Sequence, residues 1–130
     1  MLDEFFSPES KVLEITKSRS LDEDAVEISV GDTLTHLAEF RMTPANQPEM
    51  VRRTSEALDT AMEVAPGLLS ATFHRSVDGT RMYNYGQWTS EDAFKNLEKQ
   101  PGFGKEAPYW EGLARNEFHL YRVVHVLSSD

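Results

Sequence analysis

Hydrophobic positions along the chain recur in two distinct periods. From Thr33 to Met42 they alternate with polar ones, which predicts a strand whose apolar side chains share one face. From Asn46 to about Ala65 the spacing becomes three and four residues, which predicts a helix with Asn46 as its cap and Pro48 in its first turn. The apolar stripe of this helix is formed by Val51, Ser55, Leu58, Met62 and Ala65, joined by Thr54, Ala57 and Ala61.

The second half of the chain repeats this order. Pro66-Gly67 ends the helix, and residues 68–76 and 80–88 predict two strands joined by a hairpin turn at Val77-Asp78-Gly79. Thr89 is the predicted cap of a second helix, whose inward side chains are Ala93, Phe94 and Leu97. Residues 107–115 predict a further short helix, and residues 117–127 predict the last strand.

The order strand, helix, strand, strand, helix, strand is that of a ferredoxin-like α+β sandwich. Such a fold is a four-stranded antiparallel sheet with its helices on one face. The other face needs a cover, and in a domain this small a second subunit is the simplest one. We therefore expect a homodimer of the dimeric α+β barrel type.

The net charge of −9, from 22 acidic and 13 basic residues, argues against binding to nucleic acid or to an anionic membrane surface. The charge is uneven, because residues 1–32 hold 9 acidic and 3 basic residues. This asymmetry predicts an acidic N-terminal extension over residues 1–32 and one domain over residues 33–130. The extension is expected to pack on the domain or on a partner subunit.

The residue types limit the possible chemistry. The chain has no cysteine, which excludes disulfides, thiolate metal sites and cysteine nucleophiles. No apolar run is long enough for a membrane span and the acidic N-terminus is unlike a secretory signal, so the expected location is the cytoplasm. No Rossmann fingerprint, P-loop or nucleophile elbow is present, so no flavin, nicotinamide or other cofactor is expected.

Asn84 and Trp88 are the first pair of candidate site residues. They lie four apart in a predicted strand and so share a face, with Gly86 leaving room between them for a flat ligand. Asn84 offers two hydrogen-bond donors and one carbonyl acceptor, and Trp88 offers a π surface and one N–H donor. From the residues alone, a core role for Trp88 and a backbone contact for Asn84 are the commoner outcome.

The four histidines are candidate general bases, because an imidazole titrates near neutral pH. His36 ranks first, on the Ala38 face of the first strand, followed by His119 and His74. No pair has a helical metal-ligand spacing, so no metal site is predicted.

Several aromatic residues are candidates for binding a substrate. Tyr109 and Trp110 follow a glycine-rich segment and could flank a pocket, with packing as the alternative. Tyr83 and Tyr85 lie on the opposite face from Asn84 and are expected at a contact between the sheets of a dimer.

The chain resembles the antibiotic biosynthesis monooxygenase family of dimeric ferredoxin-like proteins. The resemblance covers roughly residues 33–127 and is carried by the segments 66–71, 74–80, 84–88 and 90–94, which read PGLLSA, HRSVDGT, NYGQW and SEDAF. It implies a cofactor-free oxygenase of an aromatic polyketide pathway, in which an Asn and a Trp on the third strand line the pocket, here Asn84 and Trp88. Some members carry a Tyr after this Trp, where this chain has Phe94.

The haem-degrading branch of the family has a His ligand on its second helix, and this chain has no His between His74 and His119. The first hypothesis is therefore an enzyme that oxidises a phenol or anthrone to a quinone with molecular oxygen. The alternatives are a non-oxidative polyketide cyclase or isomerase, and a non-catalytic accessory or binding protein. These alternatives differ in oxygen uptake and in partner binding by residues 1–32.

Overall fold

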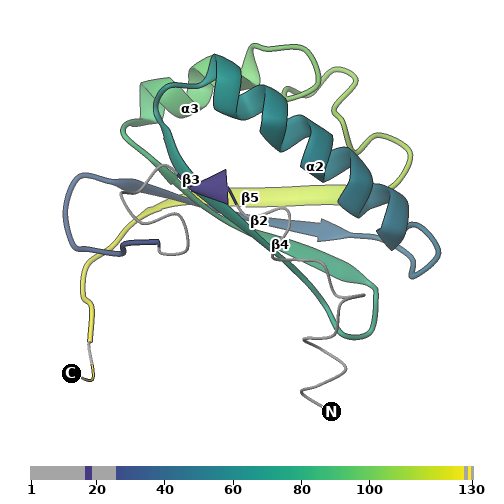
Figure 1. Cartoon of the computed structure of the whole chain (residues 1–130), viewed down its shortest axis with the longest axis horizontal. Coiled ribbons are helices and arrows are strands. Elements are labelled where there is room, and N and C mark those ends of the chain that lie inside the picture. Colours follow the sequence, from purple (N-terminus) through teal and green to yellow (C-terminus); the bar gives the residue numbers. More distant parts are fainter. Residues whose placement is uncertain (1–16, 19–25, 128, 130) are drawn as a thin grey trace.

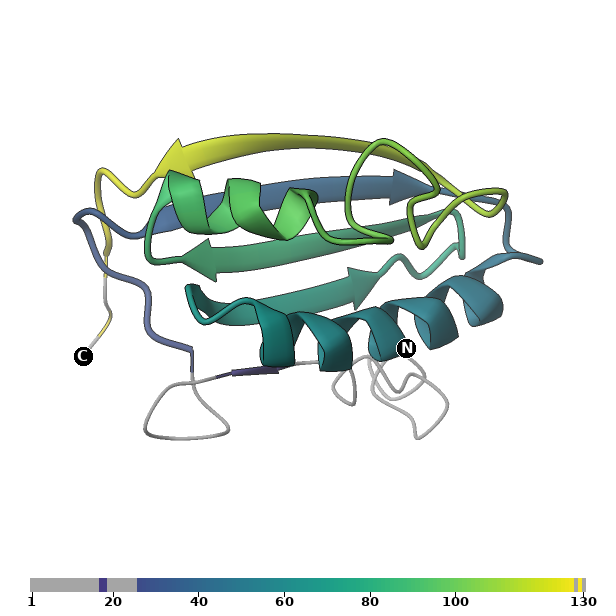
Figure 2. The same cartoon turned by 90° about the horizontal axis from the view of Figure 1, so that it is seen from above.

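The computed structural model describes residues 17–18, 26–127 and 129. Its elements are β1 (Lys17–Ser18), β2 (Leu34–Arg41), α2 (Gln47–Val64), β3 (Leu68–Arg75), β4 (Arg81–Trp88), α3 (Glu91–Glu98) and β5 (Arg115–Arg122). The strands form one antiparallel sheet in the order β1-β3-β4-β2-β5, and α2 and α3 cover one of its faces (Figure 1). The predicted ferredoxin-like α+β sandwich is confirmed. Seen from above, α2 runs along the β3 side of the sheet and α3 lies over its centre (Figure 2).

The core lies between the sheet and α2; it confirms Thr54, Leu58, Ala61 and Ala65 of the predicted stripe and corrects the rest. Met50 is fully buried, whereas Val51 and Met62 pack only at the margin of the core. The buried residues of α2 are Gln47, Met50, Thr54, Leu58 and Ala61. Both stripes have helical spacing, and the tilt of α2 on the sheet decides which one is central.

Four predictions about the ends and extents of elements are wrong. Ser90, and not Thr89, caps α3, with its side chain accepting from the Ala93 backbone N–H at 3.1 Å. Asn46 precedes α2 as predicted but makes no side-chain cap, because its backbone is already helical, with φ −87° and ψ −15°; its amide nitrogen donates to the Leu113 carbonyl oxygen at 3.4 Å. Residues 107–113 form turns, not a helix, and β5 ends at Arg122.

The hairpin between β3 and β4 is confirmed. Gly79 has a φ of +80°, which glycine adopts without strain. The Asp78 carboxylate accepts hydrogen bonds from the Thr80 backbone and hydroxyl at 3.0 and 2.6 Å. These bonds, with one from Ser76, lower the pKa of Asp78 to about 2.

The predicted N-terminal extension lies partly outside the described residues, namely at 1–16 and 19–25. In its described part, Lys17 and Ser18 pair with Ala71 and Ser70 at the β3 edge. The Glu27 carbonyl accepts a hydrogen bond of 2.8 Å from the Gln87 amide, on the sheet face away from the helices. In the part of the chain that the structure describes, no helix is long and apolar enough to cross a bilayer.

Candidate functional site

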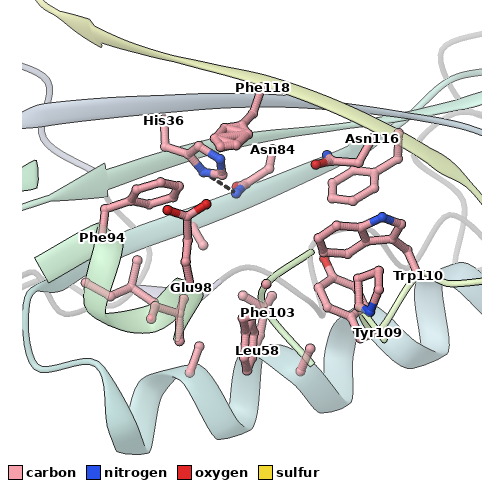
Figure 3. A pocket seen from close by; sticks show the side chains of 18 of the residues that line it. His36, Leu58, Asn84, Phe94, Glu98, Phe103, Tyr109, Trp110, Asn116 and Phe118 are labelled. Carbon is pink, nitrogen blue, oxygen red and sulfur yellow. Dashed lines mark hydrogen bonds between the residues drawn. The ribbon is translucent and has the colours of Figure 1, made fainter. Parts of the chain in front are cut away.

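A cavity of about 460 Å³ lies between the sheet and the helices (Figure 3). The inward residues of all four long strands form its floor, and α2, α3 and the segment 103–110 form its walls. Six of the eight predicted site residues line it: His36, Asn84, Trp88, Phe94, Tyr109 and Trp110. The strand register explains why the floor residues meet, since Phe73 and Ala38 flank Asn84 on the neighbouring strands.

The polar centre of the floor is the pair of His36 and Asn84. The Asn84 side-chain nitrogen lies 3.5 Å from His36 Nδ1, at the outer limit of a hydrogen bond. An amide nitrogen can only donate, so this contact requires His36 Nδ1 to be unprotonated and its proton to be on Nε2. The His36 ring also packs against Phe94 and Phe118, with ring centroids at 4.7 and 5.1 Å.

Burial among these rings lowers the pKa of His36 to about 4. The cause is loss of water around the charged form, because an imidazolium in an apolar pocket loses its hydration. His36 is therefore neutral at pH 7, which agrees with its contact to the Asn84 amide.

Asn84 carries a buried polar atom with no partner. The residue is only 8% exposed, and its side-chain oxygen makes no hydrogen bond within the described part of the chain. A buried acceptor without a partner costs about 1–3 kcal/mol. This oxygen is itself shielded from solvent, so Asn84 borders the cavity through other atoms of the residue.

Gly86 plays a different part from the one predicted. It is absent from the cavity wall, and a Cβ built on it would lie 3.4 Å from the Asn84 amide nitrogen and 3.5 Å from His36 Nδ1. The space above Gly86 is thus occupied by the His36 and Asn84 side chains. This space is therefore filled by protein side chains and is not open to a flat ligand.

Aromatic rings form the rest of the lining. At one end Trp88 meets Phe94 edge to face at 5.5 Å. At the other end Trp110 meets Phe40 at 5.4 Å and Tyr109 at 4.8 Å, both edge to face. Such walls suit a planar apolar ligand, which gains dispersion and ring contacts with them. Burial raises the pKa of Tyr109, with the nearby Thr54 hydroxyl opposing the shift, so the phenol stays protonated.

Two predicted substrate-binding residues, His74 and His119, are not in the cavity. Both are exposed and lie on the other face of the sheet, because they alternate with inward residues of β3 and β5. His74 pairs in register with Tyr83. His119 Nε2 lies 3.3 Å from a Glu117 carboxylate oxygen, in an exposed contact. The structure does not bring these two histidines together with the six predicted residues that line the cavity.

The structure adds polar lining residues that the sequence analysis missed, namely Glu98, Lys105 and Asn116. The Asn116 amide donates to the Glu39 carbonyl oxygen at 3.3 Å. Glu98 ends α3, one turn after Phe94, and this helical spacing was the signal that could have found it. Among the described residues, no group of three or more His, Asp or Glu side chains could hold a metal ion.

The chain can now be compared with known proteins. Residues 33–106 match the family described as antibiotic biosynthesis monooxygenase. The tetracenomycin-F1 monooxygenase of Streptomyces glaucescens is 30% identical over 94 residues, covering 72% of this chain and 84% of that protein. SnoaB, a cofactor-independent oxygenase from Streptomyces nogalater, superposes with a TM-score of 0.59 at 25% identity, over 76% of this chain and 100% of that one.

A Pseudomonas aeruginosa protein superposes with a TM-score of 0.61 at 18% identity, over 75% of this chain and 100% of that one. At this identity the likeness shows the fold alone. The matched residues 33–106 contain most of the cavity floor and α3, including His36, Asn84 and Trp88. On this evidence the chain belongs to the antibiotic biosynthesis monooxygenase family.

Proposed function

We propose that this protein is a cofactor-independent monooxygenase that oxidises an aromatic polyketide-type phenol or anthrone to a quinone with molecular oxygen. One observation carries the proposal: an aromatic cavity whose floor offers an amide, Asn84, of whose two side-chain N–H donors His36 takes at most one. The printed names of two relatives, a tetracenomycin-F1 monooxygenase and a cofactor-independent oxygenase, support the same reaction class.

The first step is removal of a proton from the substrate. For an anthrone this proton leaves the ring carbon opposite the carbonyl, and the electron pair of the C–H bond moves into the ring and onto the carbonyl oxygen. The Asn84 amide N–H donates to this oxygen, which becomes more negative as the anion forms. A donor placed where charge develops lowers the barrier more in a water-poor cavity than in solution.

The second step uses the electrons of the anion. The electron-rich carbon gives up electrons to O2 and bonds to one of its oxygen atoms, which yields a peroxide. Loss of the remaining C–H proton and cleavage of the O–O bond give a new carbonyl group and water. The net change is CH2 plus O2 to C=O plus H2O, so the substrate supplies all the electrons that reduce oxygen.

The lining residues assist this chemistry by holding the ring and excluding water. Trp88 and Phe94 contact one end of the ligand, and Tyr109 and Trp110 contact the other, while His36 orients the Asn84 amide through its Nδ1 lone pair. Exclusion of water protects the anion and the peroxide from side reactions.

The sheet face away from the cavity supports the proposal of a homodimer. Tyr83 and Tyr121 lie there with 41% and 45% of their surface exposed. Exposed aromatic side chains on a sheet face favour burial against a second copy. The protein is proposed to act in the cytoplasm.

Oxygen consumption with anthrone tests the function. The metal-free protein is assayed with a chelator present, and the absorbance of the quinone is followed in parallel. Uptake well above the spontaneous rate, matched to quinone formation, is expected. Conversion of a polyketide-type substrate under argon, with no uptake in air, would instead identify a cyclase or isomerase. Absence of both uptake and binding would refute the proposal.

A further inference from the structure

Glu98 is a carboxylate that the proposed mechanism has not used. It is the last residue of α3, is half-buried, and is the one acidic side chain among the described residues that line the cavity. Figure 3 shows its carboxylate pointing away from α3 into the cavity, toward the side where His36 and Asn84 lie. Its side chain has no hydrogen-bond or ion-pair partner within the part of the chain that the structure describes.

The backbone at Glu98 is closely packed. A Cβ built on Gly104 would lie 2.5 Å from the Glu98 carbonyl oxygen, so the segment after α3 can approach this point only because residue 104 is glycine. The close approach fixes the end of α3 against the segment that carries Tyr109 and Trp110. Glu98 is thus anchored at its backbone, while its carboxylate remains directed into the cavity.

We propose that Glu98 accepts the substrate proton and is therefore a catalytic residue. In this arrangement the bound ring lies between Glu98 and the part of the floor formed by His36 and Asn84. This inference rests on the proposed function. A donor on the sheet and an acceptor on the helix layer fit a substrate whose acidic C–H or O–H lies on the opposite side of the ring from its carbonyl oxygen.

The balance of charge favours a carboxylate in this role. Proton transfer from a neutral substrate to Glu98 makes the substrate negative and the carboxyl neutral, so the cavity holds one negative charge before and after the step. Loss of the proton to solvent would instead leave two negative charges in an apolar site, which is costly. Lys105, the one cation among the described residues that line the cavity, is exposed.

His36 fits the acceptor role less well. An imidazolium would sit between the rings of Phe94 and Phe118, and its Nδ1 already faces the Asn84 amide nitrogen. Burial lowers the pKa of His36 to about 4, so protonation there is disfavoured. His36 is a positioning residue for Asn84.

The complete sequence of steps returns Glu98 to its starting form. Glu98 takes the first proton and gives it to the peroxide anion, which yields a hydroperoxide. Glu98 then takes the second C–H proton, the C=O bond forms and the O–O bond breaks, releasing hydroxide. The hydroxide recovers this proton from Glu98 as water, and the carboxylate is restored.

The kinetic test compares Glu98→Gln with Glu91→Gln, an exposed carboxylate at the other end of the same helix. With anthrone, Glu98→Gln is expected to lower kcat by about 10²–10⁴-fold, the usual contribution of a general base, with KM changed by less than about threefold. Formate is expected to restore part of the rate to Glu98→Ala, and Glu91→Gln is expected to match the wild type. A kcat for Glu98→Gln within about threefold of the wild type would overturn the proposal.

A binding test separates this inference from the proposed function. A hydroxyanthraquinone cannot be oxidised in the same way, and its phenolate absorbs at longer wavelength than its phenol. The wild type is expected to bind it as the phenol, because a second negative charge beside the Glu98 carboxylate is disfavoured, and Glu98→Gln is expected to bind a larger fraction of it as the phenolate at pH 7. This difference would place the ligand hydroxyl beside the Glu98 carboxylate even if no oxygen uptake were found, whereas equal spectra would overturn that placement and the proposal with it.

Discussion

Replacement of Asn84 by alanine should separate function from folding. The Asn84 side chain makes one contact at the limit of hydrogen bonding, 3.5 Å to His36 Nδ1, and its buried oxygen has no partner among the described residues. Removal of a buried acceptor without a partner relieves a penalty of about 1–3 kcal/mol. The lost packing is limited because Asn84 borders an existing cavity.

The two effects oppose each other, so the free energy of unfolding should change by no more than about 1 kcal/mol, equivalent to about 4 °C in Tm for a domain of this size. Met82 provides a matched control. It lies two residues earlier on the same face of β4, is 1% exposed, and is not among the residues that line this cavity. Met82→Ala should cost about 2–5 kcal/mol, the usual loss for a large side chain in a packed core.

Activity should show the reverse order. Loss of one donor to a developing negative oxygen costs about 10²–10³-fold in kcat. Asn84→Ala should therefore lose this much oxygen uptake with anthrone, while its Tm stays near that of the wild type. The reasoning is refuted if Asn84→Ala unfolds as early as Met82→Ala, or if it keeps kcat within about threefold.

Three further predictions concern the rest of the fold and the site. Burial lowers the pKa of His36 from 6.5 to about 4, so the wild type should lose stability as the pH falls from about 6.5 toward 4. Urea unfolding at pH 7 and pH 4 should show that the wild type loses about 2–3 kcal/mol more free energy of unfolding than His36→Gln does. Equal pH dependence of the two proteins would contradict the buried neutral imidazole. Gly67→Ala should lower Tm by several degrees, because the Cβ of the new alanine would lie 2.7 Å from Thr89 Oγ1, where α3 approaches the sheet. An unchanged Tm would show that the neighbouring side chains move away at no cost. His119→Ala should keep the kcat and KM of the wild type, since this side chain lies on the face away from the cavity; a loss of activity in the isolated protein would place the site elsewhere.

Local patterns were sufficient to predict the fold. The alternation in residues 33–42 predicted β2 and the inward orientation of His36, and the four-residue spacing in β4 placed Asn84 and Trp88 on the same face. Such alternation is a property of the strand itself and needs no tertiary information. The same period also shows that His74 and His119 lie on the other face once the strand register is known.

The site could be predicted only in part, because its remaining details depend on how distant segments meet. Glu98 reaches the cavity because α3 lies over the centre of the sheet, and no sequence spacing relates Glu98 to Asn84. The role of Gly86 was misjudged for the same reason, since one of the two side chains that fill its space, His36, comes from β2. The tilt of α2, which selects Met50 over Val51, is likewise a result of packing.

The most direct test of the central claim is the fate of isotopically labelled oxygen. Anthrone is converted under 18O2 by the metal-free protein with a chelator present, and the quinone is analysed by mass spectrometry at early times. The account predicts one 18O atom in each quinone, with the second released as water, because the new carbonyl oxygen comes from the peroxide. A quinone with no label, or with label only when H2 18O is supplied, would contradict direct reaction of the substrate anion with oxygen.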